Sequence, residues 1–239
     1  MRPIFSFRRL IDFSLTVLSL VICAQAYAGN TSTLPDNQTT KTPTEIKKCP
    51  DLNAEHNTNL DIVREILNDR KPYAALAFIE SYDFQSPRLD LLKAQSLRQI
   101  GSFKDAEVIY QRLTTSCVAG HAYQGLGQIS NHLGDHSASA SYLRIAANIM
   151  PIDSTVRGDY GVALMQLGRF DEARREFLTA IELDSRNTRA RNNLIYLLYI
   201  TNEGKKAEML AKQHGMNTTE LEEIKANALS GQARDHLDN

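Results

Sequence analysis

The feature that most constrains this sequence is a pattern of small and apolar residues that recurs at a fixed interval. Gly127 is followed seven residues later by Gly134, and Gly161 is followed seven residues later by Gly168. The interval from Gly127 to Gly161 therefore equals the interval from Gly134 to Gly168. The positions after them keep this register: His136, Ser139, Leu143 and Ala146 in one copy, and Phe170, Ala173, Phe177 and Ala180 in the next. A fixed interval indicates one structural unit repeated along the chain.

The repeated unit is predicted to be a pair of antiparallel helices. Apolar residues recur at helical spacing, and no alternating run of Val, Ile and aromatic residues predicts a strand. Gly127 and Gly161 are expected on the first helix, where the second helix crosses closely. Gly134 and Gly168 are expected to end that helix in the left-handed conformation. Pro151 prevents the second helix from continuing into the next hairpin.

This frame resembles the tetratricopeptide repeat (TPR) family, whose repeat of about 34 residues equals the offset from Gly127 to Gly161. The clearest copy is residues 155–184, TVRGDYGVALMQLGRFDEARREFLTAIELD. The resemblance implies an all-α fold, a tetratricopeptide helical-hairpin solenoid wound as a right-handed superhelix. We expect this solenoid over residues 52–216, as four repeats plus a degenerate first hairpin.

The frame extends outward with changed residues. An upstream copy, which is one residue shorter, is carried by Leu97, Gly101, Phe103, Ala106 and Tyr110. In the downstream copy Asn202 replaces the turn glycine and Ile195 replaces the first-helix glycine, so we expect looser packing there. The degenerate hairpin is expected between residues 60 and 80, around Pro72, Ala75 and Ile79.

Residues 217–239 are predicted to form a capping helix and a frayed tail. Thr219 and Glu222 have the spacing of a capping box, and Gly231 is expected to lie just beyond the helix. The apolar positions are Leu221, Ile224 and Leu229. Such a helix would cover the apolar face of the last hairpin, because a solenoid otherwise ends on an exposed apolar surface.

Residues 1–28 have the composition of a signal peptide. Three arginines lie within the first nine residues, and residues 13–24 are apolar except for Ser and Thr. Ala26 and Ala28 provide the small residues that a signal peptidase requires, so cleavage is expected after Ala28. The alternative is a membrane anchor, but this stretch is shorter than the roughly 20 residues that span a bilayer. We therefore expect an exported, periplasmic protein.

Cys23 keeps open a second form of export. The stretch Leu20-Val21-Ile22-Cys23 partly resembles the lipobox at which bacterial lipoproteins are cut and acylated. That pattern requires a small residue before the cysteine, and Ile22 departs from it. Soluble export is therefore favoured over lipidation at Cys23, and membrane association, including an outer-membrane anchor, is expected only with lipidation.

Residues 29–51 are predicted to be a flexible tether rich in Thr, Asn and Pro, with too few apolar residues to offset the entropy of ordering. Cys49 at its end and Cys117 are the two cysteines that remain after cleavage. In an oxidising compartment such a pair can form a disulfide between the tail and the helical body. Two free thiols are the alternative.

No catalytic constellation is apparent in the sequence. It lacks CxxC, His-Glu-x-x-His, Gly-x-Ser-x-Gly and a phosphate-binding Gly-Lys-Ser/Thr. His132 and His136 are four residues apart, but Gly134 ends the helix between them, so their side chains are expected to diverge. We therefore expect that the protein is not an enzyme and binds no metal or cofactor. The alternative is an enzyme whose catalytic site is not evident from the sequence. The formal net charge of -1 gives no reason to expect a nucleic-acid partner.

A protein partner is the favoured expectation, because the first helices of stacked hairpins line a concave surface. In the repeat frame, polar and aromatic residues that suit an extended peptide backbone fall on that surface. These residues are His121, Gln124, Gln128 and Asn131 in one repeat, and Arg189, Asn192, Asn193, Tyr196 and Tyr199 in another. Arg189, Asn192 and Asn193 supply only part of the clamp with which some TPR proteins bind a C-terminal carboxylate.

The signal peptide, the Thr-rich tether, the degenerate hairpin and the repeat YGVALMQLGRFDEARREFLTAIELD running into RARNNLIYLLY resemble the TadD-type component of the Tad (Flp) pilus machinery. The resemblance implies a cell-envelope assembly factor that assists an outer-membrane secretin as pilotins do. A general periplasmic scaffold for cell-wall or outer-membrane biogenesis is the alternative within the binding class.

Overall fold

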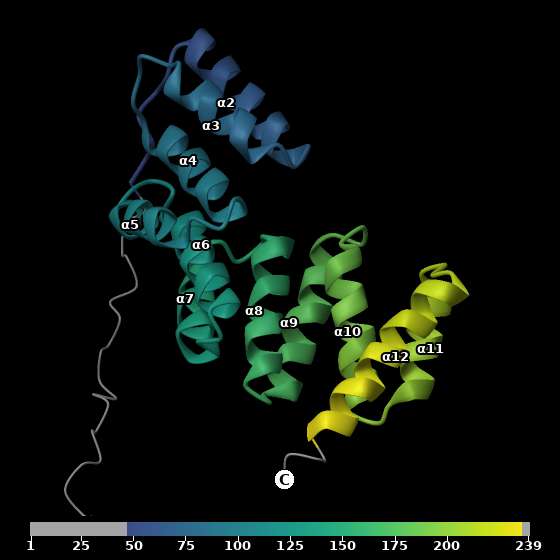
Figure 1. Ribbon diagram of the computed structural model, residues 1–239. Helices are drawn as coiled ribbons and strands as arrows, with labels where there is room; N and C mark the ends of the chain where they lie inside the picture. Colours follow the sequence, from purple (N-terminus) through teal and green to yellow (C-terminus); the bar gives the residue numbers. More distant parts are fainter. Residues whose placement is uncertain (1–46, 236–239) are drawn as a thin grey trace, which may run out of the picture. The chain divides into compact units, whose positions relative to one another are not determined.

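The structure, a computed structural model, describes residues 47–235, with side chains up to residue 230 (Figure 1). The expected signal peptide, Cys23, most of the tether and the last four residues lie outside these residues. The described part is helical throughout and contains no strand. Its helices are α2 (Ala54–Asn68), α3 (Pro72–Glu80), α4 (Pro87–Gln99), α5 (Phe103–Leu113), α6 (Ala119–His132), α7 (His136–Ile149), α8 (Ser154–Gln166), α9 (Phe170–Leu183), α10 (Thr188–Ile200), α11 (Gly204–Gln213) and α12 (Thr218–Asp235).

The helices pair into hairpins that stack in chain order, which confirms the predicted helical-hairpin solenoid. Each even-numbered helix from α2 to α10 packs against the helix that follows it, and α5, α7 and α9 pack against the next hairpin (Figure 1). The first helices of consecutive hairpins also contact one another, α4 with α6, α6 with α8 and α8 with α10. We call the side of this row that carries Arg98, Gln128, Asp159 and Arg189 the first-helix surface.

Close helix crossings occur where the glycine spacing predicts them. A Cβ atom added at Gly161 would lie 2.6 Å from the Phe177 ring, and one added at Gly127 would lie 2.5 Å from Leu143 Cγ. Real Cβ contacts are longer than this, so these positions require glycine in the present packing.

The predicted turns between the two helices of a hairpin also have the expected backbone. Gly134 and Gly168 have φ values of 82° and 70°, in the left-handed region that glycine adopts without steric cost. Asn202 replaces the glycine between α10 and α11 at φ 60°. Asparagine is among the few other residues that tolerate this conformation, so the turn keeps its geometry.

The starts of α8 and α10 are fixed by side-chain caps that lie one repeat apart. Asp153 accepts hydrogen bonds from the backbone N–H groups of Thr155 and Val156 at the start of α8. Asn187, one repeat after Asp153, accepts one from Ala190 at the start of α10. The Asn187 side chain also donates to the Ser154 hydroxyl at 2.6 Å. The Asn187 cap therefore joins α10 to α8 as well as starting α10.

The prediction of looser packing at Ile195 is wrong. Ile195 is fully buried in the same apolar cluster as Ala211. Ala211 lies one repeat after Phe177 and therefore holds the register position of that ring. In the hairpin α8–α9 the first helix supplies glycine and the second supplies a large ring, whereas α10–α11 reverses the sizes. The reversal keeps the space between the helices filled.

The degenerate first hairpin is present as α2 and α3, joined by a turn in which Arg70 has φ 59°. Its core contains Leu60, Val63 and Ala75, with Ile79 and residues of α4. Cys49, in the segment predicted as tether, forms a disulfide with Cys117 in the link between α5 and α6. The last residues of the predicted tether are therefore attached covalently to the helical body.

The C-terminal helix differs from its predicted bounds. Asn217, rather than Thr219, caps α12, because its Oδ1 accepts from the Glu220 backbone N–H. The helix continues through Gly231 to Asp235, so Gly231 does not lie beyond it as predicted. Ala228 is the fully buried residue, while Leu229 is half exposed. The helix packs against α10, which agrees with its predicted covering role.

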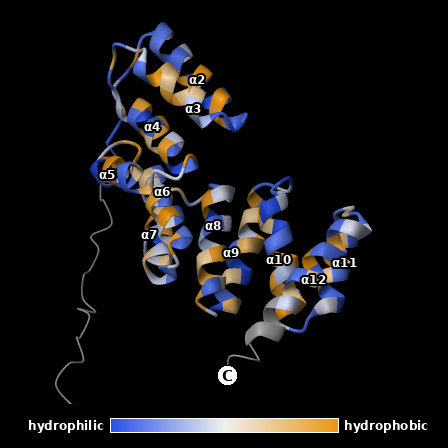
Figure 2. Cartoon of the chain, viewed as in Figure 1, coloured by the Kyte–Doolittle hydropathy of each residue, from blue (hydrophilic) through white to orange (hydrophobic). Residues whose placement is uncertain are grey.

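Every described helix carries polar as well as apolar residues (Figure 2). Within residues 47–235, none of the helices is both long enough and apolar enough to span a bilayer.

Candidate binding site

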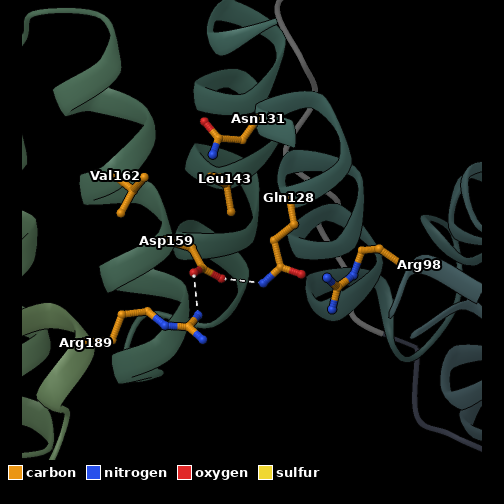
Figure 3. Close-up of a pocket in the computed structure, with 7 residues that line it drawn as sticks. All are labelled: Arg98, Gln128, Asn131, Leu143, Asp159, Val162 and Arg189. Carbon is orange, nitrogen blue, oxygen red and sulfur yellow. Dashed lines mark hydrogen bonds and ion pairs between the residues drawn. The ribbon is translucent and has the colours of Figure 1, made fainter. Parts of the chain in front are cut away.

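The centre of the first-helix surface is a buried carboxylate, Asp159 of α8 (Figure 3). Its side chain is 9% exposed. Gln124 and Gln128 of α6 both donate from Nε2 to Asp159 Oδ2, at 2.8 and 2.7 Å. The two amide donors lie one turn apart on the same face of α6, so the helix geometry brings both to one oxygen.

Burial raises the pKa of the Asp159 carboxyl above its ordinary value. The hydrogen bonds from Gln124 and Gln128, and the positive charges of Arg189 and Arg98, act in the opposite direction and are the smaller effects. The site therefore holds an acidic group whose charge is only partly compensated by the surrounding chain.

Two arginines from other hairpins flank this carboxylate. Arg189 Nη1 of α10 lies 3.7 Å from Asp159 Oδ1, and the Arg189 side chain is 70% exposed. Arg98, in the last turn of α4, has a buried Nε without a hydrogen-bond partner. Figure 3 shows both guanidinium groups turned toward the region around Asp159 and Gln128.

These side chains line an open cavity of about 280 Å³. It is lined by Arg98, Gln128, Asn131, Leu143, Asp159, Val162 and Arg189 (Figure 3). A second hollow of about 640 Å³ shares Arg98, Gln128 and Asn131 and extends to Phe103 and His132. The cavities therefore follow the first-helix surface from α4 to α10, and they combine hydrogen-bond donors, acceptors and both signs of charge.

Four of the residues predicted for the partner surface meet here: Gln124, Gln128, Asn131 and Arg189. Asn131 also lies 3.1 Å from His136 Nδ1. His121 and Asn193 are half-buried on the same row of helices but do not line the cavity.

The remaining predicted positions on α10 are engaged by the chain itself. Tyr199 is 6% exposed and belongs to the core, so the prediction that it faces a partner is wrong. Tyr196 is partly buried against the same core. Asn192 donates to Glu220 of α12 at 2.9 Å. The physical reason is that α12 covers this end of the surface, which the repeat frame alone does not include.

Asp159 and Arg98 were not among the predicted site residues, although the repeat frame contains a signal for both. Asp159 lies one repeat before Asn193, and Arg98 lies one of the shorter upstream repeats before Asn131. Asn193 and Asn131 were both assigned to the surface. When the register is extended to every repeat, it places both Asp159 and Arg98 on the same surface as these asparagines.

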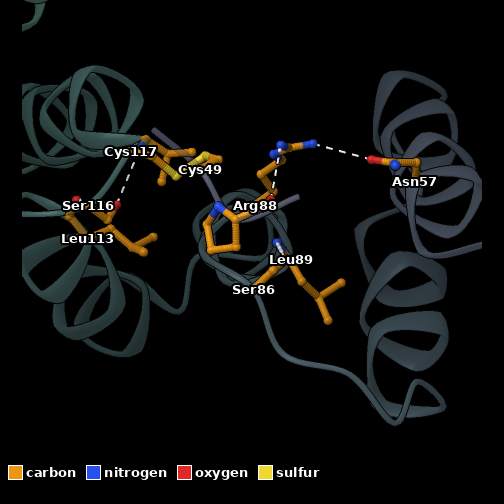
Figure 4. The surroundings of a disulfide bond; sticks show 10 residues. Cys49, Asn57, Ser86, Arg88, Leu89, Leu113, Ser116 and Cys117 are labelled. Atoms are coloured by element: carbon orange, nitrogen blue, oxygen red, sulfur yellow. Dashed lines mark hydrogen bonds between the residues drawn. A yellow bond between two sulfur atoms is a disulfide. The ribbon is translucent and has the colours of Figure 1, made fainter. Parts of the chain in front are cut away.

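The disulfide Cys49–Cys117 lies away from this cavity, beside the start of α4 (Figure 4). Its Cα atoms are 4.9 Å apart, and the two cysteines have a sequence separation of 68. Arg88 of α4 donates to Asn57 Oδ1 of α2 at 3.3 Å and to the Pro50 carbonyl at 3.5 Å. These contacts join the first hairpin, the residues around Cys49 and the second hairpin.

The two histidines with apparent metal spacing have separate roles. The His132 ring lies 4.5 Å from that of Phe103, and His136 is bound to Asn131. Among the described residues, no group of three His, Cys, Asp or Glu side chains is placed to hold a metal ion. What the cavity around Asp159 can do chemically is bind polar and charged groups.

Comparison with known proteins identifies the repeat. A tetratricopeptide repeat model matches residues 161–213. "TPR repeat-containing protein PA4299" of Pseudomonas aeruginosa is 31% identical to the chain over 214 residues, covering 90% of this chain and 84% of the relative. Both matches rest on sequence, and the second extends over most of the chain.

Solved structures share the same arrangement of helices. MamA from Desulfovibrio magneticus RS-1 has a TM-score of 0.53 and 14% identity, over 72% of this chain and 98% of that chain. A Thermobaculum terrenum O-GlcNAc transferase has a TM-score of 0.51 and 20% identity, over 54% of this chain and 25% of that chain. At these identities the likeness supports the fold alone. The hairpin geometry and the sequence match of the Pseudomonas aeruginosa relative to 90% of this chain support the same assignment. The chain belongs to the tetratricopeptide repeat proteins.

Proposed function

We propose that this chain is a non-enzymatic scaffold that binds an extended segment of a protein partner on its first-helix surface. The observation that carries the proposal is the row of polar and charged groups around Asp159, which comes from four consecutive hairpins. Such a row suits a bound chain, because successive backbone and side-chain groups can be met by successive repeats.

The arginines at the edges of the cavity give the partner segment a chemical requirement. Arg98 has an unpartnered Nε, and most of the Arg189 side chain is open to solvent. Asp159 lies between them and is already held by two amides. A partner segment with carboxylate or carbonyl oxygens can therefore gain hydrogen bonds from the exposed Arg189 guanidinium without displacing the two amides that hold Asp159.

We further propose that the scaffold acts in the cell envelope after export, most specifically in Tad (Flp) pilus assembly, where it would assist an outer-membrane secretin. The signal-peptide composition of residues 1–28 and the disulfide Cys49–Cys117 support export, since disulfides persist in oxidising compartments. The resemblance to TadD-type components supports the pilus assignment.

Affinity purification from a cross-linked cell envelope tests the partner. We expect recovery of a secretin or another pilus component by the wild-type chain. We expect Arg98→Glu to lose the partner, and Lys104→Glu, a charge reversal at an exposed position on α5, to retain it. Recovery of cell-wall enzymes without pilus proteins would favour a general periplasmic scaffold, and equal capture by both variants would remove the first-helix surface from the proposal.

Export has its own test. The intact mass of protein purified without reductant should show the loss of residues 1–28. Adding a reductant should then raise the mass by that of the two hydrogen atoms gained when one disulfide is reduced. A fatty-acid label that depends on Cys23 would instead support lipidation, and free thiols at Cys49 and Cys117 would remove the support that the disulfide gives to export.

A further inference from the structure

A second surface, separate from the first-helix surface, is an apolar groove formed by the last two hairpins. Its cavity is about 390 Å³. Buried Leu194 and Leu198 of α10 lie between walls supplied by α9 and α11. We call it the second-helix groove, and it is lined by Arg174, Leu178, Leu194, Leu198, Lys206, Met209, Leu210 and Gln213.

The walls of this groove expose apolar side chains that the fold does not require. Leu178 is 43% exposed and Met209 is 63% exposed. At the register positions one repeat earlier, the corresponding residues are Arg144 and Arg175. Leu210 likewise replaces Glu176. The preceding hairpins fold with charged residues at these positions, so the apolar surface of the last groove has a cause other than packing.

Charge changes at the rim in the same comparison. The charged residues that line the groove are Arg174 and Lys206, and their equivalents one repeat earlier are Ala140 and Glu172. Both cations contact Glu203, and Asp171 also interacts with Arg174, but neither acid lines the groove, so the lining residues themselves are positive. The Arg174 guanidinium is held by Glu203, whereas 62% of the Lys206 side chain is exposed. Lys206 can therefore donate further hydrogen bonds to an acidic group at the rim.

We infer that the second-helix groove binds an amphipathic helix of a partner protein whose apolar side is flanked by acidic residues. Leucine-sized side chains one turn apart would occupy the space between Leu178 and Met209, in the manner of helix-in-groove recognition. Methionine suits such a contact because its flexible side chain adapts to the shape of the bound residue. Arg174 and Lys206 would pair with the flanking carboxylates.

The probe for this inference is a fluorescein-labelled helical peptide of about 16 residues, with two leucines one turn apart and glutamates on either side. A matched peptide has lysine in place of each glutamate. Fluorescence anisotropy with the full chain should show saturable binding of the glutamate peptide. The lysine peptide should bind at least about tenfold more weakly, because it meets the positive rim.

Leu178→Arg and Met209→Arg install the residues that the preceding repeat carries, so both variants are expected to fold. Each should weaken binding of the glutamate peptide by at least about tenfold. Val108→Arg, which changes an exposed apolar residue on α5 outside the groove, should bind as the wild type does. Circular dichroism on heating checks that all three variants keep the fold.

Three results would overturn the inference. The first is equal binding of the glutamate and lysine peptides, and the second is the absence of binding to the wild-type chain. The third is self-association in sedimentation velocity that Leu178→Arg abolishes, which would assign the groove to a second copy of the chain. Arg98→Glu lies on the first-helix surface and should not affect this peptide, so the test is independent of the proposed function.

Discussion

The hairpins α8–α9 and α10–α11 fill the same space in opposite ways. In α8–α9, Gly161 allows Phe177 to approach, and an added Cβ would lie 2.6 Å from the ring. In α10–α11, the equivalent positions hold Ile195 and Ala211, which are 0% and 1% exposed. The large residue has moved from the second helix to the first. What the repeat preserves at this crossing is the filled volume, not the identity of either residue.

The same two hairpins also differ on the first-helix surface, at the register position held by Asp159 and Asn193. Asp159 of α8 is buried and held by two glutamine amides, whereas Asn193 of α10, one repeat later, is half-buried and uncharged. The backbone frame is shared, but the electrostatic environment is set by what α6 places opposite. Packing can therefore be inferred from the register more readily than the site can.

The largest expected effect comes from giving α10 the residue that the repeat frame usually has. We predict that Ile195→Gly destabilises the protein by about 4 kcal/mol, from a buried cavity and the cost of glycine in a helix. Urea unfolding measures it. Arg175→Gly, at an exposed helical position of α9, isolates the glycine cost of about 1 kcal/mol. A gain in stability for Ile195→Gly would mean that the hairpin tolerates Ile195 under strain.

Phe177→Ala makes the corresponding change in α8–α9. The ring is fully buried, so we predict a loss of about 3–4 kcal/mol in the free energy of unfolding. The same urea titration applies, with Leu178→Ala on the adjacent, half-exposed position as the control. A loss below about 1 kcal/mol would show that the helices close over the missing ring.

Gly161→Leu overfills the space that Phe177 occupies. We predict a loss of about 1–3 kcal/mol, because the added side chain must separate α8 from α9. The melting temperature measured by circular dichroism checks this. Gly158, on the same helix, has only ordinary contacts around an added Cβ, so Gly158→Ala should raise the melting temperature slightly, through the gain of about 1 kcal/mol that alanine has over glycine in a helix. An unchanged melting temperature for Gly161→Leu would contradict the close crossing.

The smallest effect concerns the pH dependence that distinguishes Asp159 from Asn193. Burial raises the pKa of Asp159 in the folded protein, so the folded state binds its proton more tightly than the unfolded state does. The contribution of Asp159 to stability should therefore fall as the pH rises above about 4, where an ordinary Asp carboxyl titrates. Asp159→Asn should lose this dependence, with a stability change within about 1 kcal/mol at acid pH. Parallel pH profiles would contradict the raised pKa.

Much of the fold follows from local chemistry that is visible in the sequence. Gly134 and Gly168 mark turns because few other residues adopt their backbone conformation, and Asn202 is one of those few. Gly127 and Gly161 mark close crossings because an added Cβ would lie within 3 Å of the facing Leu143 or Phe177 side chain. These positions are predictable because each depends on the backbone or on one neighbouring helix.

Features that depend on several helices at once are harder to predict from the sequence. Ile195 alone predicts loose packing, whereas Ile195 together with the small Ala211 on the facing helix predicts a filled space. The repeat frame places Tyr199 on the surface predicted to bind a partner, but α12 and the core bury it. Asp159 acquires its properties from Gln124 and Gln128 on another helix. Such properties require the tertiary arrangement, even where the register supplies the position.

A double-mutant cycle on Gly161 and Phe177 tests most directly whether the large and the small residue at the helix crossing can change places. Gly161→Ile combined with Phe177→Ala gives α8–α9 the pair of residues found in α10–α11. If the filled volume is what the crossing requires, the double variant should be more stable than the sum of the single changes predicts, by about 2 kcal/mol or more. Strict additivity of the two losses in urea unfolding would contradict the exchange and would mean that each residue is required for itself.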